Sequence, residues 1–104
     1  MTTKKKTTKK TIPVILCCGQ NGRAVLYGRV TRKPVPGKPV TLYGARMVLY
    51  WAAECGGLLG LAAKGPKGAT RITHVVPETT ETVWQESTVC TPEAAKAIES
   101  WPAA

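Results

Sequence analysis

The chain has 104 residues, of which 15 are Lys or Arg and 6 are acidic, giving a formal net charge of +9 at pH 7. This length suits one domain and excludes a large multidomain enzyme, and the hydrophobic fraction of 43% is in the globular range. The six acidic residues are all Glu, and so few carboxylates disfavour hydrolysis by a carboxylate pair and metal binding by a cluster of carboxylates. We therefore expect a protein that is not an enzyme and holds no metal ion or cofactor.

The N-terminal segment, MTTKKKTTKKT, holds a dense group of positive charges and no side chain that would join a core. Its lysines are Lys4, Lys5, Lys6, Lys9 and Lys10. We predict a disordered basic tail over residues 1–11 and a single α+β domain over residues 12–104. Such a tail attracts nucleic-acid phosphates without reading sequence, and a solubilising extension is the alternative.

The runs IPVILCC and RAVLYGRV, joined by the turn GQNG, predict a β-hairpin over residues 12–30, with Gly28 marking a bulge or bend. Residues 31–39, TRKPVPGKP, contain three prolines and a glycine, which predicts an exposed loop. Its cations are Arg32, Lys33 and Lys38. We interpret this loop as a second candidate contact for nucleic acid.

Residues 40–52, VTLYGARMVLYWA, predict a long strand with a bend at Gly44. Strict alternation would place on the core face Ala45, Met47, Leu49 and Trp51. It would place on the opposite face Arg46, Val48 and Tyr50. A guanidinium near a phenol can meet a phosphate and a flat base together, whereas packing or an oligomer contact is the alternative for the same pair.

A short helix over Leu58 to Ala63, ended at Gly65, precedes a cationic turn. The turn lacks the Walker spacing, but its backbone N–H groups and cations suit an anion, with a plain exposed turn as the alternative. The predicted ligand-binding residues are therefore Arg46, Tyr50, Trp51, Lys64, Lys67 and Arg71.

Two further strands are predicted at residues 69–76 and 80–90, separated by the turn PETT at 77–80. Thr91 then caps a helix that begins at Pro92. We predict a small α+β fold, a bent antiparallel sheet or partly open β-barrel of about five strands with one short helix and a C-terminal helix. We also expect a homo-oligomer, because a core this small is not expected to bury three tryptophans and a subunit interface would bury them. These are Trp51, Trp84 and Trp101.

The four cysteines, Cys17, Cys18, Cys55 and Cys90, form no C-x-x-C pair, so we interpret them as buried free thiols of a reducing compartment. No apolar run is long enough to span a bilayer, and the apolar run after the basic start is short for a signal peptide. We expect a soluble, intracellular protein without membrane partners.

Several features follow one another along the chain in a recognisable order. They are the strand from Ala24, the pair Ala45 and Arg46, the pair Tyr50 and Trp51, the Leu-rich turn at 58–62, Gly65, and the helix start TPEAA. Over residues 24–98 this order resembles a family of small tailed-bacteriophage proteins whose domain is of unknown function. The resemblance implies a phage accessory protein in the host bacterial cytoplasm, with a compact β-rich fold and no catalytic residues to transfer.

The leading functional hypothesis is a non-enzymatic bacteriophage anti-defence protein that binds or sequesters a nucleotide-type anionic ligand through Arg46, Tyr50 and the cationic turn. One alternative is a virion structural or assembly component whose lysine tail touches packaged DNA. Another is a sequence-independent nucleic-acid-binding protein that uses the tail and the loop at 31–39.

Overall fold

The computed structural model describes residues 11–19 and 22–104, and within them it has six strands, two α-helices and one 3-10 helix. In chain order these are β1 Ile12–Cys18, β2 Ala24–Val30, β3 Val40–Tyr50, η1 Ala53–Cys55, α2 Gly57–Lys64, β4 Arg71–Ile72, β5 Val76–Glu81, β6 Trp84–Val89 and α3 Pro92–Ser100. The strands form one antiparallel sheet in the order β4-β3-β2-β1-β6, with β5 also paired to β3. The predicted α+β class is confirmed, and the sheet is open rather than a closed barrel.

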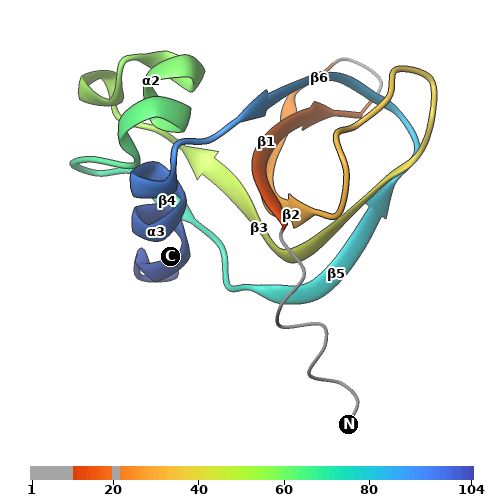
Figure 1. Ribbon diagram of the computed structural model, residues 1–104. Helices are drawn as coiled ribbons and strands as arrows, with labels where there is room; N and C mark the ends of the chain where they lie inside the picture. The colour runs from red at the N-terminus through yellow and green to blue at the C-terminus, as the bar shows by residue number, and fades with distance from the viewer. Residues whose placement is uncertain (1–10, 20–21) are drawn as a thin grey trace, which may run out of the picture.

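The sheet curls on itself, and α2 and α3 lie together on one side of it (Figure 1). The central strands β1 and β2 are apolar at nearly every position, so both of their faces are buried. Leu16 and Leu26 face a core enclosed by the curl, whereas Ile15 and Tyr27 face a second core shared with the helices. The sheet thus separates two apolar clusters, one packed on each of its faces.

A β-bulge in β3 decides which of its side chains face each core. Tyr27 pairs with Arg46 and Arg29 pairs with Tyr43, so Gly44 and Ala45 together oppose Gly28. Gly44 has a φ of 61°, a left-handed conformation that favours glycine. The predicted irregularities at both glycines are confirmed.

The structure corrects which face of β3 beyond the bulge is the more buried. Beyond Gly44, Arg46 and Val48 are buried toward the helices, whereas Met47 and Leu49 are exposed. The predicted alternation itself holds from Ala45 onward, because Met47 pairs with Leu26 on the curl side and Arg46 pairs with Tyr27 on the helix side. The assignment of Met47 and Leu49 to the core was wrong, because the helices cover the opposite face of the strand.

The predicted turn at residues 77–80 is also wrong. These residues belong to β5, which pairs with β3 from Val40↔Glu81 to Ala45↔Val76, and the chain turns only at residues 82–83. Pro77 is compatible with β5 because, among the described strands, β5 pairs with β3 alone and needs N–H groups on one side only. The strand predicted over 69–76 forms only the two-residue β4 and the first residue of β5.

The C-terminal helix begins as the sequence predicted. The Ala94 N–H donates to Thr91 Oγ1 at 3.1 Å, and Pro92 occupies the first helical position. Ala94, Ala95 and Ile98 bury one stripe of α3 in the helix-side core. The helix therefore packs on this core through two alanines and Ile98, and it lies against α2.

The tryptophans and cysteines are covered within one chain. All three indoles are half-buried, and those of Trp84 and Trp101 donate to the carbonyls of Lys38 and Thr70 at 2.7 and 2.9 Å. The four cysteines are buried free thiols, as predicted. The expectation of a homo-oligomer, which rested on the tryptophans, stays a prediction.

No helix in the part of the chain that the structure describes is long and apolar enough to cross a membrane.

Candidate functional site

Arg46, the centre of the predicted ligand site, is buried with an exposed fraction of 5%. Its Nε donates to the Thr73 carbonyl at 2.7 Å, where the chain passes between β4 and β5. Its Nη1 donates to the Ile98 carbonyl at 2.7 Å, in the last turn of α3. The guanidinium therefore satisfies backbone carbonyls at an interrupted strand and at a helix C-terminus, where a cation is electrostatically favoured.

The other predicted ligand residues lie elsewhere. Tyr50 is 52% exposed and pairs across the β3–β4 ladder with the exposed Arg71, so the structure brings these two together. Trp51 packs against the helix-side core, and Lys64 and Lys67 are exposed around the end of α2. The six residues do not converge on one site with Arg46.

The cationic turn after α2 already faces an acidic side chain. A Cβ atom built on Gly68 would lie 2.7 Å from Glu54 Oε1, which places this carboxylate against the turn. The C-terminal end of α2 also directs its negative dipole toward the turn. Both features disfavour an anion between Lys64 and Arg71.

A partly exposed polar network that sequence reasoning missed lies between β2 and α3. The Tyr27 hydroxyl and Arg29 Nε donate to Glu99 Oε2 at 2.5 and 2.6 Å. Burial alone would raise the pKa of Glu99, but the hydrogen bonds from Arg29 and Tyr27 outweigh it and lower this pKa. Burial, followed by the bond to Glu99, raises the pKa of Tyr27. Tyr27 and Arg29 are two residues apart on one strand and so share a face, which was a usable signal in the sequence, but nothing local pointed to Glu99.

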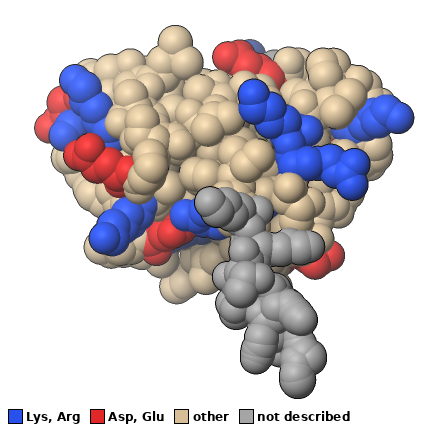
Figure 2. Space-filling view, viewed as in Figure 1, with Lys and Arg blue, Asp and Glu red and all other residues tan. Residues whose placement is uncertain are grey.

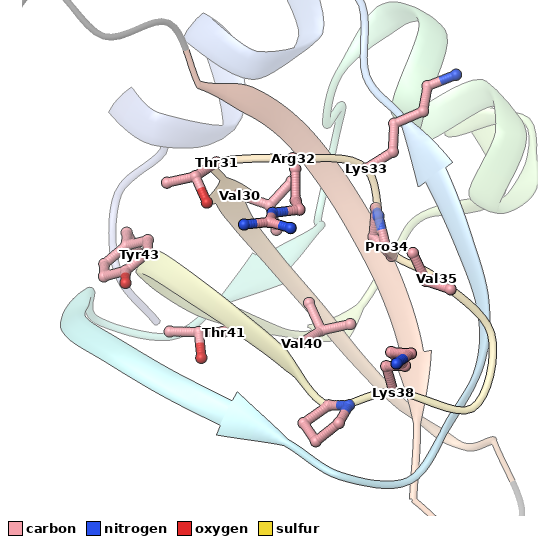
Figure 3. A pocket seen from close by; sticks show the side chains of 11 residues that line it. Val30, Thr31, Arg32, Lys33, Pro34, Val35, Lys38, Val40, Thr41 and Tyr43 are labelled. Atoms are coloured by element: carbon pink, nitrogen blue, oxygen red, sulfur yellow. The ribbon is translucent and has the colours of Figure 1, made fainter.

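The strongest candidate site is the split between β2 and β3. Their pairing ends at Arg29↔Tyr43, and beyond this pair the two strands diverge around an open cavity of about 340 Å³. The buried side chains of Val30 and Val40 contribute its apolar surface, as do Pro34 and Val35 from the loop. Figure 3 shows Thr31 just after the end of β2 and Thr41 on β3, with Tyr43 at one end of the split.

The predicted loop cations border this cavity. The Arg32 guanidinium lies in the gap between the diverging strands, whereas Lys33 points away from it (Figure 3). The residues that line the cavity, all of them described, include Lys38 and no acidic residue. Within the described ranges, the structure gives these three cations no ion pair. Their charge is therefore available to an anion from solution.

The backbone of this loop is held in place from two directions. The Lys38 N–H donates to the Val35 carbonyl at 3.0 Å, closing a turn, and the Lys38 carbonyl accepts from Trp84 Nε1. Figure 2 shows basic side chains gathered over the side of the molecule where the loop runs. The loop is thus a positioned cationic surface.

The N-terminal segment joins the domain beside the same loop. Ile12 pairs with Val30, the last residue of β2, and Thr11 Oγ1 accepts from Arg29 Nη1 at 3.3 Å. The lysines of the predicted tail lie outside the described residues, as does the predicted tail itself apart from Thr11. Their point of attachment is nevertheless fixed at the end of the sheet that carries Arg32.

The match to a protein family covers residues 11–101, from the start of β1 to the end of α3. This chain belongs to the family described as a domain of unknown function, DUF6948. No curated protein and no solved structure matches the chain. The expectation that the chain belongs to a family of unknown function is confirmed, and its bacteriophage origin stays a prediction.

The DUF6948 domain also has a second cavity, of about 320 Å³, on the inner side of the curl. Leu26 and Met47 line it together with Cys18, His74 and Glu81. Burial, then the neighbouring Glu81 carboxylate, raises the pKa of Cys18 to about 11, which keeps the thiol protonated and a poor nucleophile. In residues 11–19 and 22–104, no three His, Cys or Glu side chains are grouped to hold a metal ion.

Proposed function

We propose that this DUF6948 chain is a non-enzymatic protein that binds nucleic acid through the phosphate backbone, without reading sequence. The observation that carries the proposal is the pairing of Ile12 with Val30, which attaches the lysine-rich segment beside the basic β2–β3 loop. The loop follows Val30, and the lysine-rich segment precedes Ile12, so the two basic segments connect to the sheet at one residue pair.

The charge distribution supports a polyanion as the ligand. Eight of the 15 basic residues lie in these two segments, three in the loop and five in residues 1–10. Each cation that neutralises a phosphate releases condensed counterions, so binding is strong at low salt and weakens steeply as salt is added. Positively charged side chains without carboxylate partners are the ones that give this effect.

The test is fluorescence anisotropy with labelled DNA of unrelated sequences, at salt concentrations between about 50 and about 200 mM. We expect similar affinities for all sequences and a linear fall of log K with log salt concentration. A full-length variant with Lys4, Lys5, Lys6, Lys9 and Lys10 replaced by Gln should bind more weakly with a shallower slope. An unchanged slope would remove the N-terminal lysines from the interface, and no binding at low salt would reject the function.

The biological setting belongs to the same proposal. The resemblance over residues 24–98 supports a bacteriophage accessory protein of the host bacterial cytoplasm, and a virion component that touches packaged DNA is the alternative. Fractionation of infected cells and stoichiometric analysis of purified virions distinguish the two locations.

The anti-defence hypothesis, sequestration of a nucleotide signal, relied on Arg46 beside Tyr50. The burial of Arg46 against backbone carbonyls gives that pair little support, so we rank nucleic-acid binding first. Self-association remains part of the proposal, and native mass spectrometry of the full chain measures both the oligomer number and any retained nucleotide.

A further inference from the structure

We propose that the split between β2 and β3 is a nucleotide-binding site, in which a base stacks on Tyr43 and its phosphate meets Arg32. In a polymer, this site takes an unpaired nucleotide, so the chain prefers single-stranded over double-stranded nucleic acid. The polymer form of the proposal rests on the nucleic-acid-binding function proposed above, and the site itself does not.

Tyr43 provides an accessible aromatic surface at the cavity. It is 42% exposed and lies on the last β2–β3 pair before the strands diverge, opposite Arg29. Its other cross-strand neighbour is Glu78 on β5. The sheet holds the Tyr43 backbone on both sides, so the ring can bind a base with little loss of backbone freedom.

The phosphate side of the site is formed by the first loop residues. The Arg32 guanidinium lies in the gap between the strands, and Thr31 also lines the cavity (Figure 3). A guanidinium offers paired N–H donors that match phosphate oxygens, and a hydroxyl adds a further donor. Lys38, on the opposite rim, provides a second positive charge.

The cavity itself suits a small planar group, such as an unpaired base, better than a nucleic-acid duplex. It is an open cavity of about 340 Å³, and Val30, Val40, Pro34 and Val35 are among the residues that line it. Apolar and cationic side chains lining one cavity match a nucleotide, which joins a flat ring to a charged phosphate. Bases in a duplex are already stacked, so a duplex can present only its phosphates to this rim.

The experiment compares a single-stranded DNA of about 15 nucleotides with the duplex of the same sequence, by anisotropy with the full-length chain. We expect the single strand to bind about tenfold more tightly, the scale of one base stacked on an aromatic side chain. Tyr43→Ala should remove this preference, whereas Tyr43→Phe, which keeps the ring, should retain it.

Tyr50→Ala is the matched control, because Tyr50 is an exposed tyrosine at the other end of the same strand. It should leave the single-strand preference unchanged. Thermal unfolding of each variant shows whether the fold is intact, and Tyr43→Phe keeps the test decisive if Tyr43→Ala unfolds. Equal binding of single strand and duplex, or an equal loss in the Tyr43→Ala and Tyr50→Ala variants, would overturn the polymer form.

A calorimetric arm with free mononucleotides and cyclic dinucleotides separates the two sources of a nucleotide. Binding of a free nucleotide that is lost in Arg32→Ala but not in Lys33→Ala supports the site and identifies a soluble ligand. If no nucleic acid binds but a nucleotide does, the proposed function fails while the site stands. If neither a nucleotide nor a single-strand preference is detected, the site is rejected even where duplex binding persists.

Discussion

Two arginines near the two ends of the β2–β3 pairing have opposite environments. Arg46 is buried, and its guanidinium donates to carbonyls at the end of α3 and between β4 and β5. Arg32 lies where the strands diverge, on a loop bordering an open cavity. The contrast shows that an arginine's role depends on the acceptors that the fold brings to it, because both residues are the same in chemistry and charge.

The two surrounding regions differ in the same way. At the helix side of the sheet, Tyr27, Arg29 and Glu99 complete one another's hydrogen bonds, and no buried side-chain polar atom among the described residues lacks a partner. At the split, the described cations have no carboxylate partner. A satisfied network stabilises the fold, whereas unpaired surface charge is available to a ligand.

The largest expected effect is on stability, at Arg46. Arg46→Ala leaves buried carbonyls without donors and should lower the free energy of unfolding by about 3 kcal/mol. Arg46→Lys keeps the charge but not the forked geometry of the guanidinium, so its free energy of unfolding should lie between those of Arg46→Ala and the wild type. Urea unfolding measures both, and a stable Arg46→Ala that loses nucleotide binding would restore Arg46 as a ligand contact.

The next effect is on affinity, at Arg32. Arg32→Ala should weaken single-strand binding about fivefold and make the slope of log K against log salt about one unit shallower. Its stability should change by less than about 0.5 kcal/mol, because the side chain is exposed. Lys33→Ala, with the same charge change on a side chain directed away from the split, should have the smaller effect on affinity. Equal effects would reduce the split to general electrostatic attraction.

A smaller effect concerns pH and the Glu99 network. Because the folded-state pKa of Glu99 lies below its ordinary value of 4.5, its contribution to stability is complete above that value and is lost as the pH falls through the lowered pKa. The contribution is no more than about 1 kcal/mol, since the Arg29 and Glu99 side chains are 36% and 40% exposed.

The check is the unfolding free energy of wild type and Glu99→Gln at about pH 6 and about pH 3. Gln keeps an acceptor for the Tyr27 hydroxyl but does not titrate, so the difference between the two proteins should shrink on acidification. A constant difference would mean that the ion pair contributes nothing that depends on the charge of Glu99.

The smallest expected effect is at Glu78, the acidic neighbour of Tyr43. Glu78→Gln removes a negative charge beside the stacking surface and should tighten single-strand binding about twofold at low salt. Glu93→Gln, an equal charge change in the first turn of α3, is the control. If both variants tighten binding alike, only net charge matters and Tyr43 has no local role.

Local signals in the sequence were sufficient for most elements. The apolar runs of β1 and β2 and the Thr91–Pro92 start of α3 are determined by side chains within a few residues, so they were predicted closely. The turn predicted at residues 77–80 failed because a proline and small polar residues are also acceptable in an edge strand. Whether β5 forms depends on β3, and the residues of the two strands that pair are more than thirty positions apart in the chain.

The sequence by itself determined the α+β class, the basic loop and the lysine-rich segment, because composition and short-range periodicity specify these. Only the tertiary structure decided the roles of individual residues. The bulge at Gly44 set the phase of β3 so that Arg46 lies on the helix side, where α3 buries it, and the register of β1 against β2 brought Thr11 beside Arg29. Both outcomes depend on pairing between strands, and pairing is a long-range choice that no short segment of the chain encodes.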